Sequence, residues 1–529
     1  MPDLMNMGAM SIDSTASTAA MSAASQEEEN TVVRTVSPEF LCGRLDIFAS
    51  YDDITADNVV AEVNQAITYH NINLISEEYL YWYRRGIQPI LNRTKERNTY
   101  VLTKCLENHA QEIVTFKNGY FLQEPATYCS RRSGVQRKID KLNEYVYRSG
   151  KYEADNIVAD WFHTVGKGVL YVEETADKDI PFRSFALDPR SAFVVYSMSA
   201  GHRPVYAVNI AKLGPDTKID VYTDKNIYRL KGGYAGESVT GFPTFQTLAT
   251  KLEKVERNLL GHIPIIEYRY DSVNMSSFES VVSLLDCINQ VQSGRIDGVE
   301  QFIQSVIVAV NCQFEDGVTA SQIKKQGMVL LSSIGENKAD FKILSEELNQ
   351  DQTQTLVDNL YEQVLRIVAM PSTTKGGRST SDTGSAVLFR DGWEQAGTSC
   401  RNTEDHWRQS DQYYRQIVLD ILSRRKLLTG LSVVDFDLNF VRNETANVQS
   451  KAQAFQTLLA AGLHPELAAK KSGVSNDPVS DIKMSEKYLK MIWGDPDQAV
   501  ETEEKGTGFG EAEIIEEDND NGETTEGNV

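Results

Sequence analysis

The feature of the sequence that most constrains the fold is a pair of long helical patterns separated by roughly 40 residues of strand-like sequence. Residues 277–306 carry apolar side chains at spacings of three and four, which predicts one amphipathic helix of about 45 Å. A second helical pattern runs from about Asn349 to Met370. Two strand-like runs, Val306–Phe314 and Met328–Ser332, lie between them and are separated by a turn signal. Two long helices therefore bracket a small β insertion.

A polar loop and a third long helix follow this pair. Pro371 ends the second helix, because the residue before a proline is disfavoured in the helical region. Residues 371–384 are rich in Gly, Ser and Thr and lack a hydrophobic anchor, which is typical of a flexible connector. A third helix of about 60 Å is predicted from about Ser385 to Lys426. The later predicted elements are a strand at Val433–Val441 and helices at Thr445–Ala461, Pro465–Lys470 and Val479–Ile492.

The N-terminal half has a mixed pattern, which predicts a substantial α+β domain over about residues 37–275. Helical periods occur at Asn58–Asn71 and Asn98–Asn118. Strand-like runs occur at Gly168–Glu173, Ala192–Ser197, Val205–Ile210 and Ile263–Tyr270.

Negative charge is concentrated at the two ends of the chain. The formal charge is −22, of which residues 1–30 carry −5 and residues 501–529 carry −10, so the 470 residues between them carry only −7. Residues 1–36 and 496–529 also lack hydrophobic periodicity, and we expect a disordered leader and a disordered acidic tail. The long middle part is close to neutral, and the chain's 41% of hydrophobic residues allow several folded parts.

Patterns for several common sites are absent from the sequence. No apolar run approaches the roughly 18 residues needed to span a bilayer, and the N-terminus lacks a secretion signal, so we expect a soluble, unsecreted protein with no membrane partner. The 6 cysteines form no CxxC pair and the 7 histidines no HxxxH pair, which argues against a zinc site. No P-loop and no Ser/His/Asp set is identifiable. We therefore expect no catalytic residue, no metal and no cofactor.

Two features leave alternatives open. Asp435 and Asp437 could place two carboxylates on one face of a strand, as a two-metal nuclease requires, although the polar face of an ordinary strand explains them as well. Basic clusters after Tyr81-Trp82-Tyr83 and at residues 131–141 could contact nucleic acid. Solvated or salt-bridged faces are the commoner use of such clusters, and we favour the structural interpretation in both cases.

Five short sequence words occur in a fixed order around these elements. They are Tyr83–Leu91, Asn118–Pro125, Gly261–Glu267, Leu284–Ser293 and Thr383–Val387. Together with the order helix, β insertion, helix, loop and long helix, they resemble the portal protein family of tailed bacteriophages, particularly of siphophages with Gram-positive hosts, over about residues 40–495. One departure is Thr383-Gly384-Ser385-Ala386, which varies a pattern usually written Ser-Gly-x-Ala.

The resemblance implies a homo-oligomeric ring, commonly a dodecamer, at one vertex of the capsid. The implied parts of each subunit are a wing (37–276 and 385–441), two stem helices (277–306 and 349–370), a clip (307–348), a tunnel loop (371–384) and a crown (442–495). The physical argument agrees, since a lone pair of long helices cannot bury its apolar stripes, whereas a ring packs each pair against its neighbours.

The resemblance also implies a non-catalytic channel through which double-stranded DNA is packaged and ejected. Lys375 and Arg378 of the loop would touch phosphates transiently, because DNA that must slide cannot be held by many neutralising contacts. Hydroxyl groups of the same loop would hydrogen-bond without holding the DNA: Ser372, Thr373, Thr374, Ser379 and Thr380.

The implied protein partners are the terminase large subunit, a head-tail adaptor, and the major capsid and scaffolding proteins. Candidate docking residues for the terminase or the adaptor are the clip lysines Lys324, Lys325, Lys338 and Lys342. The implied location is the portal vertex of the virion, after assembly in the host cytoplasm. The alternatives are a metal-dependent nuclease built on Asp435 and Asp437, and another virion structural protein such as a minor head protein or adaptor.

Overall fold

The computed structural model describes most of the chain between residues 41 and 475. The described ranges are 41–95, 101–132, 134–213, 216–234, 247–303, 306–310, 312–313, 332–333, 340–344, 350–372, 392–441 and 448–475, with scattered positions between 478 and 488. The predicted leader, most of the polar loop and the acidic tail lie outside these ranges. The chain divides into a larger unit, up to residue 128 with 137–443, and a smaller unit, 129–136 with the residues from 444 onward.

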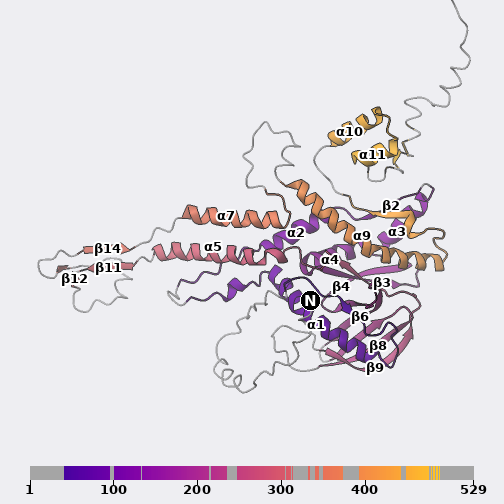
Figure 1. The fold of residues 1–529 in the computed structure, drawn as a ribbon, viewed down its shortest axis with the longest axis horizontal. Helices are drawn as coiled ribbons and strands as arrows, with labels where there is room; N and C mark the ends of the chain where they lie inside the picture. The colour runs from indigo at the N-terminus through magenta and orange to yellow at the C-terminus, as the bar shows by residue number, and fades with distance from the viewer. Residues whose placement is uncertain are drawn as a thin grey trace, which may run out of the picture. The chain divides into compact units, whose positions relative to one another are not determined.

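A six-stranded sheet covered by one long helix forms part of the larger unit (Figure 1). The strand order is β1-β5-β6-β7-β8-β9, with β1 and β5 parallel and the other pairs antiparallel. Helix α1 (Val59–Arg84) contains no glycine or proline, and its apolar side, including Val63 and Ile67, packs against the sheet. The strands are β1 (Ile47–Phe48), β5 (Ala192–Tyr196), β6 (Pro204–Leu213), β7 (Asp216–Tyr222), β8 (Asn226–Tyr234) and β9 (Thr247–Arg257).

A three-stranded antiparallel sheet, β10-β3-β4, packs with helices α4 and α9 in the same unit. Fully buried Trp407 of α9 lies against Tyr268 of β10, with ring centroids 4.2 Å apart, and against Phe162 of α4 at 5.4 Å. The bounds are β3 (Lys167–Glu174), β4 (Phe182–Leu187), β10 (Ile265–Arg269), α4 (Lys151–Val165) and α9 (Trp393–Arg424). Further short elements are α2 (His109–Phe121), α3 (Gln136–Arg148), β2 (Thr127–Ser130), β15 (Phe436–Asn439) and the 3-10 helices Pro89–Asn92, Glu279–Val281 and Val433–Asp435.

The two long helices predicted around a β insertion are confirmed. Helices α5 (Val282–Ile303) and α7 (Gln350–Ile367) lie side by side and share one core with α2 and the end of α1 (Figure 1). Strand β11 (Val306–Val310) follows α5 and pairs antiparallel with β14 (Asp340–Leu344). A second short pair joins β12 (Cys312–Gln313) to β13 (Ser332–Ser333).

The smaller unit contains two short helices, α10 (Val448–Ala460) and α11 (Pro465–Ser472), as the periodicity predicts. In α11 the buried residues are Ala468 and Ala469, whereas Leu467 is 52% exposed. The described helices of this unit therefore bury little apolar surface. The helix predicted at Val479–Ile492 lies largely outside the described residues.

Several predicted boundaries were wrong, and tertiary packing explains most of them. The helix predicted over Asn98–Asn118 begins only at His109, because residues 101–107 run along α5 instead. Helix α1 continues beyond Asn71 to Arg84. Helix α9 begins at Trp393, where Gly392 has φ of 83°, outside the helical region; residues 385–391 lie outside the described part.

The predictions also missed or misplaced strands. The strand predicted at Val433–Val441 is limited to β15, because residues 433–435 form a 3-10 turn with a capping box from Ser432. Strands β7, β8 and β9 were not predicted, although apolar and polar residues alternate along part of each, as in residues 218–222, which is the pattern expected of a half-buried strand. Strand β14, which pairs with β11, was also missed.

Candidate functional site

The residues predicted to contact DNA or partners are only sparsely represented in the described structure. Half-buried Ser372 follows α7, whereas Thr373, Thr374, Lys375, Arg378, Ser379 and Thr380 lie outside the described residues. The backbone of Lys342 lies in β14 opposite Val308, and Lys324, Lys325 and Lys338 lie outside the described part. Their proposed roles stay predictions.

The described candidate site is the base of the α5–α7 pair, where a stripe of polar side chains runs along α5. Asp286, Asn289, Ser293 and Asp297 follow one another at helical spacings of three and four, so they share one face. Asn289 and Ser293 are fully buried and Asp297 is 2% exposed. Because buried polar groups need hydrogen-bond partners, this stripe must be matched by another segment.

The matching segment is residues 101–107, which precede α2. Three alternate backbone N–H groups donate to the stripe: Glu107 to Asn289 Oδ1 at 2.7 Å, Cys105 to Ser293 Oγ at 2.9 Å, and Thr103 to Asp297 Oδ1 at 2.7 Å. Two residues of extended chain rise about 6.6 Å and four residues of helix about 6.0 Å, so the two repeats stay in step. We call this set of bonds the α5 ladder.

Further bonds close both ends of the α5 ladder. The Tyr83 hydroxyl donates to Asp286 Oδ1 at 2.9 Å, and Asn289 Nδ2 donates to Gln88 Oε1 at 2.6 Å. At the other end, Arg93 and Lys95 contact Asp297 Oδ2 at 2.6 and 2.5 Å. Burial raises the pKa of this carboxyl, but the hydrogen bonds from Lys95, Thr103 and Arg93 outweigh burial and hold it at about 2.

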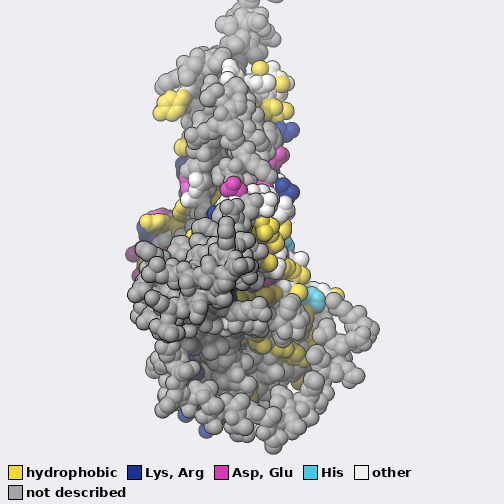
Figure 2. Space-filling model, turned by 90° about the vertical axis from the view of Figure 1, so that its left-hand side faces the viewer, with side chains coloured by type: hydrophobic (Ala, Val, Ile, Leu, Met, Phe, Trp, Pro, Cys, Tyr) yellow, Lys and Arg dark blue, Asp and Glu magenta, His cyan; other side chains and the backbone are white. Residues whose placement is uncertain are grey.

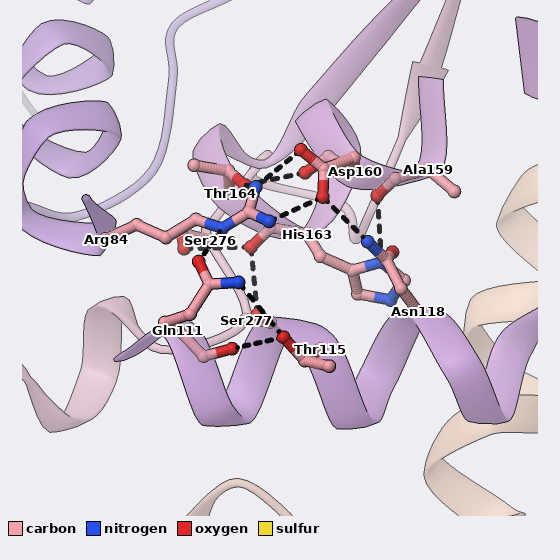
Figure 3. A network of polar contacts seen from close by, with 10 residues as sticks. All are labelled: Arg84, Gln111, Thr115, Asn118, Ala159, Asp160, His163, Thr164, Ser276 and Ser277. Atoms are coloured by element: carbon pink, nitrogen blue, oxygen red, sulfur yellow. Dashed lines mark hydrogen bonds and ion pairs between the residues drawn. The ribbon is translucent and has the colours of Figure 1, made fainter. Parts of the chain in front are cut away.

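A second polar network fixes the turn that leads into α5 (Figure 3). Arg84, at the end of α1, donates to both carboxylate oxygens of Asp160 on α4 and to Thr164 Oγ1. Ser276 and Ser277, just before α5, donate their hydroxyls to the carbonyl of His163 at 3.1 and 2.8 Å (Figure 3). The turn is thus bonded directly to α4, and Arg84 bonds α4 to α1.

The side chains of α4 and α2 complete that network. Asn118 of α2 donates to Asp160 Oδ1 at 3.0 Å, and its own Oδ1 lies 2.6 Å from His163 Nδ1. Burial lowers the pKa of His163 to about 3, so this imidazole is neutral. Its Nδ1 also lies 2.9 Å from the Ala159 carbonyl, an acceptor, which assigns the proton to Nδ1.

Close backbone packing holds the same turn from the other side. A Cβ on Gly166, whose φ is 89°, would lie 1.9 Å from the Asn274 carbonyl oxygen, and one on Gly43 would lie 2.1 Å from that of Val273. Arg44 forms an ion pair with Glu279, and both side chains are fully buried. The entry to α5 is therefore tightly constrained.

The structure supports the structural interpretation for part of each basic cluster. Arg84, Arg93 and Lys95 form ion pairs within the chain, and Arg97 lies outside the described residues. Lys138 donates to the carbonyls of Thr429 and Gly430, and Lys141 to that of Leu427.

The two carboxylates considered for a nuclease have local roles. Asp435 Oδ2 accepts a hydrogen bond from the Ser432 amide in the capping box, and Asp435 lies in a 3-10 turn rather than in a strand. Asp437 lies in β15, 3.9 Å from Arg415. Among the described residues, no group of three His, Cys, Asp or Glu side chains could hold a metal ion. Likewise, none of the helices described here is long and apolar enough to cross a membrane.

Apolar side chains remain exposed on the α5–α7 pair in the isolated chain. Ile296 and Val299 of α5 are 43% and 45% exposed, and Leu356 and Ile367 of α7 are 48% and 52% exposed. In the view from the side of the β11–β14 strands, hydrophobic and charged side chains are both visible on the described part of the surface, without being assigned to single elements (Figure 2). The pair thus has a polar stripe satisfied within the chain and apolar positions that are not covered.

Sequence reasoning identified the apolar stripe of α5 but missed the polar one. The signal was present, because Asp286, Asn289, Ser293 and Asp297 have the same helical spacing as the apolar residues. Its partner segment could not be identified, since residues 101–107 lie about 190 positions earlier and bond through their backbone. Chemically, this arrangement positions a helix pair rigidly and brings no reactive groups together.

Comparison with known proteins identifies a protein family whose model matches this chain. The model of the family described as "Phage portal protein, SPP1 Gp6-like" matches residues 65–492. A solved chain from a structure titled "Virion of native gene transfer agent (GTA) particle" is similar at 12% sequence identity and a TM-score of 0.37, covering 69% of this chain and 90% of that one. No curated protein matches the chain.

Proposed function

Because the chain belongs to the SPP1 Gp6-like family of phage portal proteins, a family of structural proteins rather than enzymes, we propose that it forms the ring channel at one capsid vertex. Double-stranded DNA would be packaged and ejected through this channel. The observation that carries the proposal is the family match over residues 65–492, which includes the α5–α7 pair and its base.

The helix pair supports this role physically. In a ring, α5 and α7 would be the stem helices, and their exposed apolar residues would pack against neighbouring subunits. The α5 ladder would keep each stem at a fixed inclination to its wing, so that twelve copies could close a ring. The wing would then comprise residues 37–276 and 385–441, the clip 307–348 and the crown 442–495.

Residues 371–384 would form the tunnel loop facing DNA. Lys375 and Arg378 would supply a few weak, sequence-independent phosphate contacts per subunit, consistent with a nearly neutral middle of the chain. Replacing both by alanine should reduce the amount of DNA packaged or retained, while rings still form. Normal packaging by this double variant would reject the loop's role in DNA contact.

The clip, residues 307–348, would be the surface on which protein partners dock. Lys324, Lys325, Lys338 and Lys342 are proposed to meet the terminase large subunit or the head-tail adaptor, and the wing to meet capsid and scaffolding proteins. Replacing the four lysines by glutamate should weaken terminase binding to purified rings. Undiminished affinity would remove the docking assignment without affecting the channel itself.

A genetic experiment tests the proposed function as a whole. Disrupting the gene in its phage should yield capsids without DNA, and supplying the intact chain from a plasmid should restore filled virions. DNA-filled capsids that lack this protein would overturn the proposal.

A further inference from the structure

A histidine at the start of α2 contacts α7 directly and is linked to α5 through a glutamate. The His109 ring has Nδ1 2.8 Å from Glu112 Oε2 and Nε2 3.1 Å from Glu107 Oε2, so each ring nitrogen faces a carboxylate. Its ring also packs against that of Tyr361 on α7, with centroids 4.6 Å apart. The His109 side chain is 19% exposed.

Each of the two carboxylates uses its other oxygen to hold a stem helix. Glu107 Oε1 accepts a hydrogen bond from Gln292 of α5 at 2.7 Å. Glu112 Oε1 accepts one from the Tyr361 hydroxyl of α7 at 2.6 Å. His109 therefore orients two acceptors, one for each helix of the stem.

Only the imidazolium form satisfies this geometry. A neutral imidazole carries one N–H, and its second nitrogen presents a lone pair, which would face a carboxylate oxygen about 3 Å away without a proton between them. The imidazolium carries two N–H groups and can donate to both carboxylates at once. Loss of one proton from His109 therefore converts one attractive contact into a repulsive one.

We propose that His109, Glu107, Glu112, Gln292 and Tyr361 form a pH-dependent clasp that fixes helix α2 of the wing to both stem helices. The labels wing and stem rest on the proposed function, but the clasp itself rests on the contacts. Protonated His109 closes the clasp, and neutral His109 loosens it while the apolar core shared by α2, α5 and α7 keeps the helices packed. The clasp would thus adjust the wing–stem contact without unfolding it.

The charges around His109 agree with this assignment. Burial lowers the pKa of His109, but the hydrogen bonds and charges of Glu112 and Glu107 outweigh burial and raise it above its usual value of 6.5. The bond from His109 lowers the pKa of Glu112, which stays ionised. Burial raises the pKa of the Tyr361 phenol, so it remains a donor. Two other groups lie near this set. Arg295 of α5 donates a hydrogen bond to Gln292 Oε1 at 3.5 Å. Burial raises the pKa of the Cys105 thiol.

These shifts define the pH window. The pKa of His109 is higher in the folded protein than its usual value of 6.5. A group of this kind stabilises the folded state fully at pH values below its pKa in the unfolded chain. That stabilisation is lost as the pH rises through its pKa in the folded protein. The clasp should be closed below about pH 6.5 and should open as the pH rises through the higher pKa that His109 has in the folded protein.

Hydrogen exchange on the assembled full-length protein tests the clasp. Exchange at about pH 6 and about pH 8.5, corrected for the intrinsic pH dependence of the exchange rate, should be about two- to tenfold faster at the higher pH in peptides around 289–296 and 357–364. The His109→Gln variant should show the faster exchange at both pH values. His262→Gln is the matched control, because His262 also contacts a carboxylate, Asp420, but lies outside the helix pair.

Equal corrected exchange at both pH values in the wild type would overturn the clasp, as would an unchanged pH response in His109→Gln. The wild-type comparison decides the matter even if His109→Gln does not assemble. Imaging of the same samples separates the two proposals: rings without the pH response contradict the clasp alone, whereas a purely monomeric protein contradicts the proposed channel.

Discussion

Replacing Asp297 by asparagine should free residues 101–107 from α5 without changing the shape of the side chain. Asparagine Oδ1 can still accept from the Thr103 amide, but its Nδ2 then faces the donors of Arg93 and Lys95. The pKa of Asp297 is about 2, against an ordinary value of 3.8, which corresponds to about 2.4 kcal/mol of stabilisation at neutral pH, at 1.36 kcal/mol per pH unit. The 3% exposure of its side chain means that little of this is lost to solvent screening.

The assay is hydrogen exchange of the Thr103 and Cys105 amides, both of which donate to the α5 ladder. A loss of about 2.4 kcal/mol predicts roughly 50-fold faster exchange of these amides if the segment opens locally. The depressed pKa further predicts that the wild type loses this protection as the pH falls from about 4 towards 2, whereas Asp297→Asn lacks this dependence. Asp179→Asn, at an exposed position, is the control. Unchanged exchange in Asp297→Asn would refute the assignment of Asp297 as the anchor.

Two further predictions concern the wing. Gly166→Ala should lower the free energy of unfolding by about 3 kcal/mol or more, because its φ is 89° and a Cβ would lie 1.9 Å from the Asn274 carbonyl oxygen. Thermal unfolding measures this loss as a lower midpoint. The control is Gly119→Ala in helix α2, which should be neutral or slightly stabilising because its Cβ would have no atom within 4 Å. Burial lowers the pKa of Lys117 from 10.5 to about 8. Lys117→Met should therefore raise the free energy of unfolding at pH 7 by at most about 3 kcal/mol, which thermal unfolding measures as a higher midpoint. The wild type should gain stability between about pH 8 and 10, and the variant should lack this gain. A lower midpoint for Lys117→Met at pH 7 would contradict that reasoning.

The parts of the fold that could be predicted from sequence are those with long, regular periodicity. The stripes of 277–306 and 349–370 extend over several turns, so the helices α5 and α7 were predicted to within a few residues. Short strands such as β7 carry few apolar residues, and the sheet becomes evident only when its neighbours are placed beside it.

The base of the helix pair shows why the rest could not be predicted. Residues 101–107 lack helical structure because their amides bond to Asn289, Ser293 and Asp297, and nothing local to the segment encodes those partners. The absence of a side chain at Gly166 is likewise required by the close approach of the Asn274 carbonyl, far along the chain, whereas its left-handed backbone is the local C-cap of α4. Lys375 and Arg378 were predicted from the order of elements and the resemblance, and they remain predictions.

The oligomeric state of the purified full-length chain tests the central claim most directly. Mass photometry combined with negative-stain imaging should show a closed ring, near twelve subunits of 59.2 kDa each, with an axial hole. A particle with the mass of a single chain at all concentrations, with no ring in the images, would contradict the account.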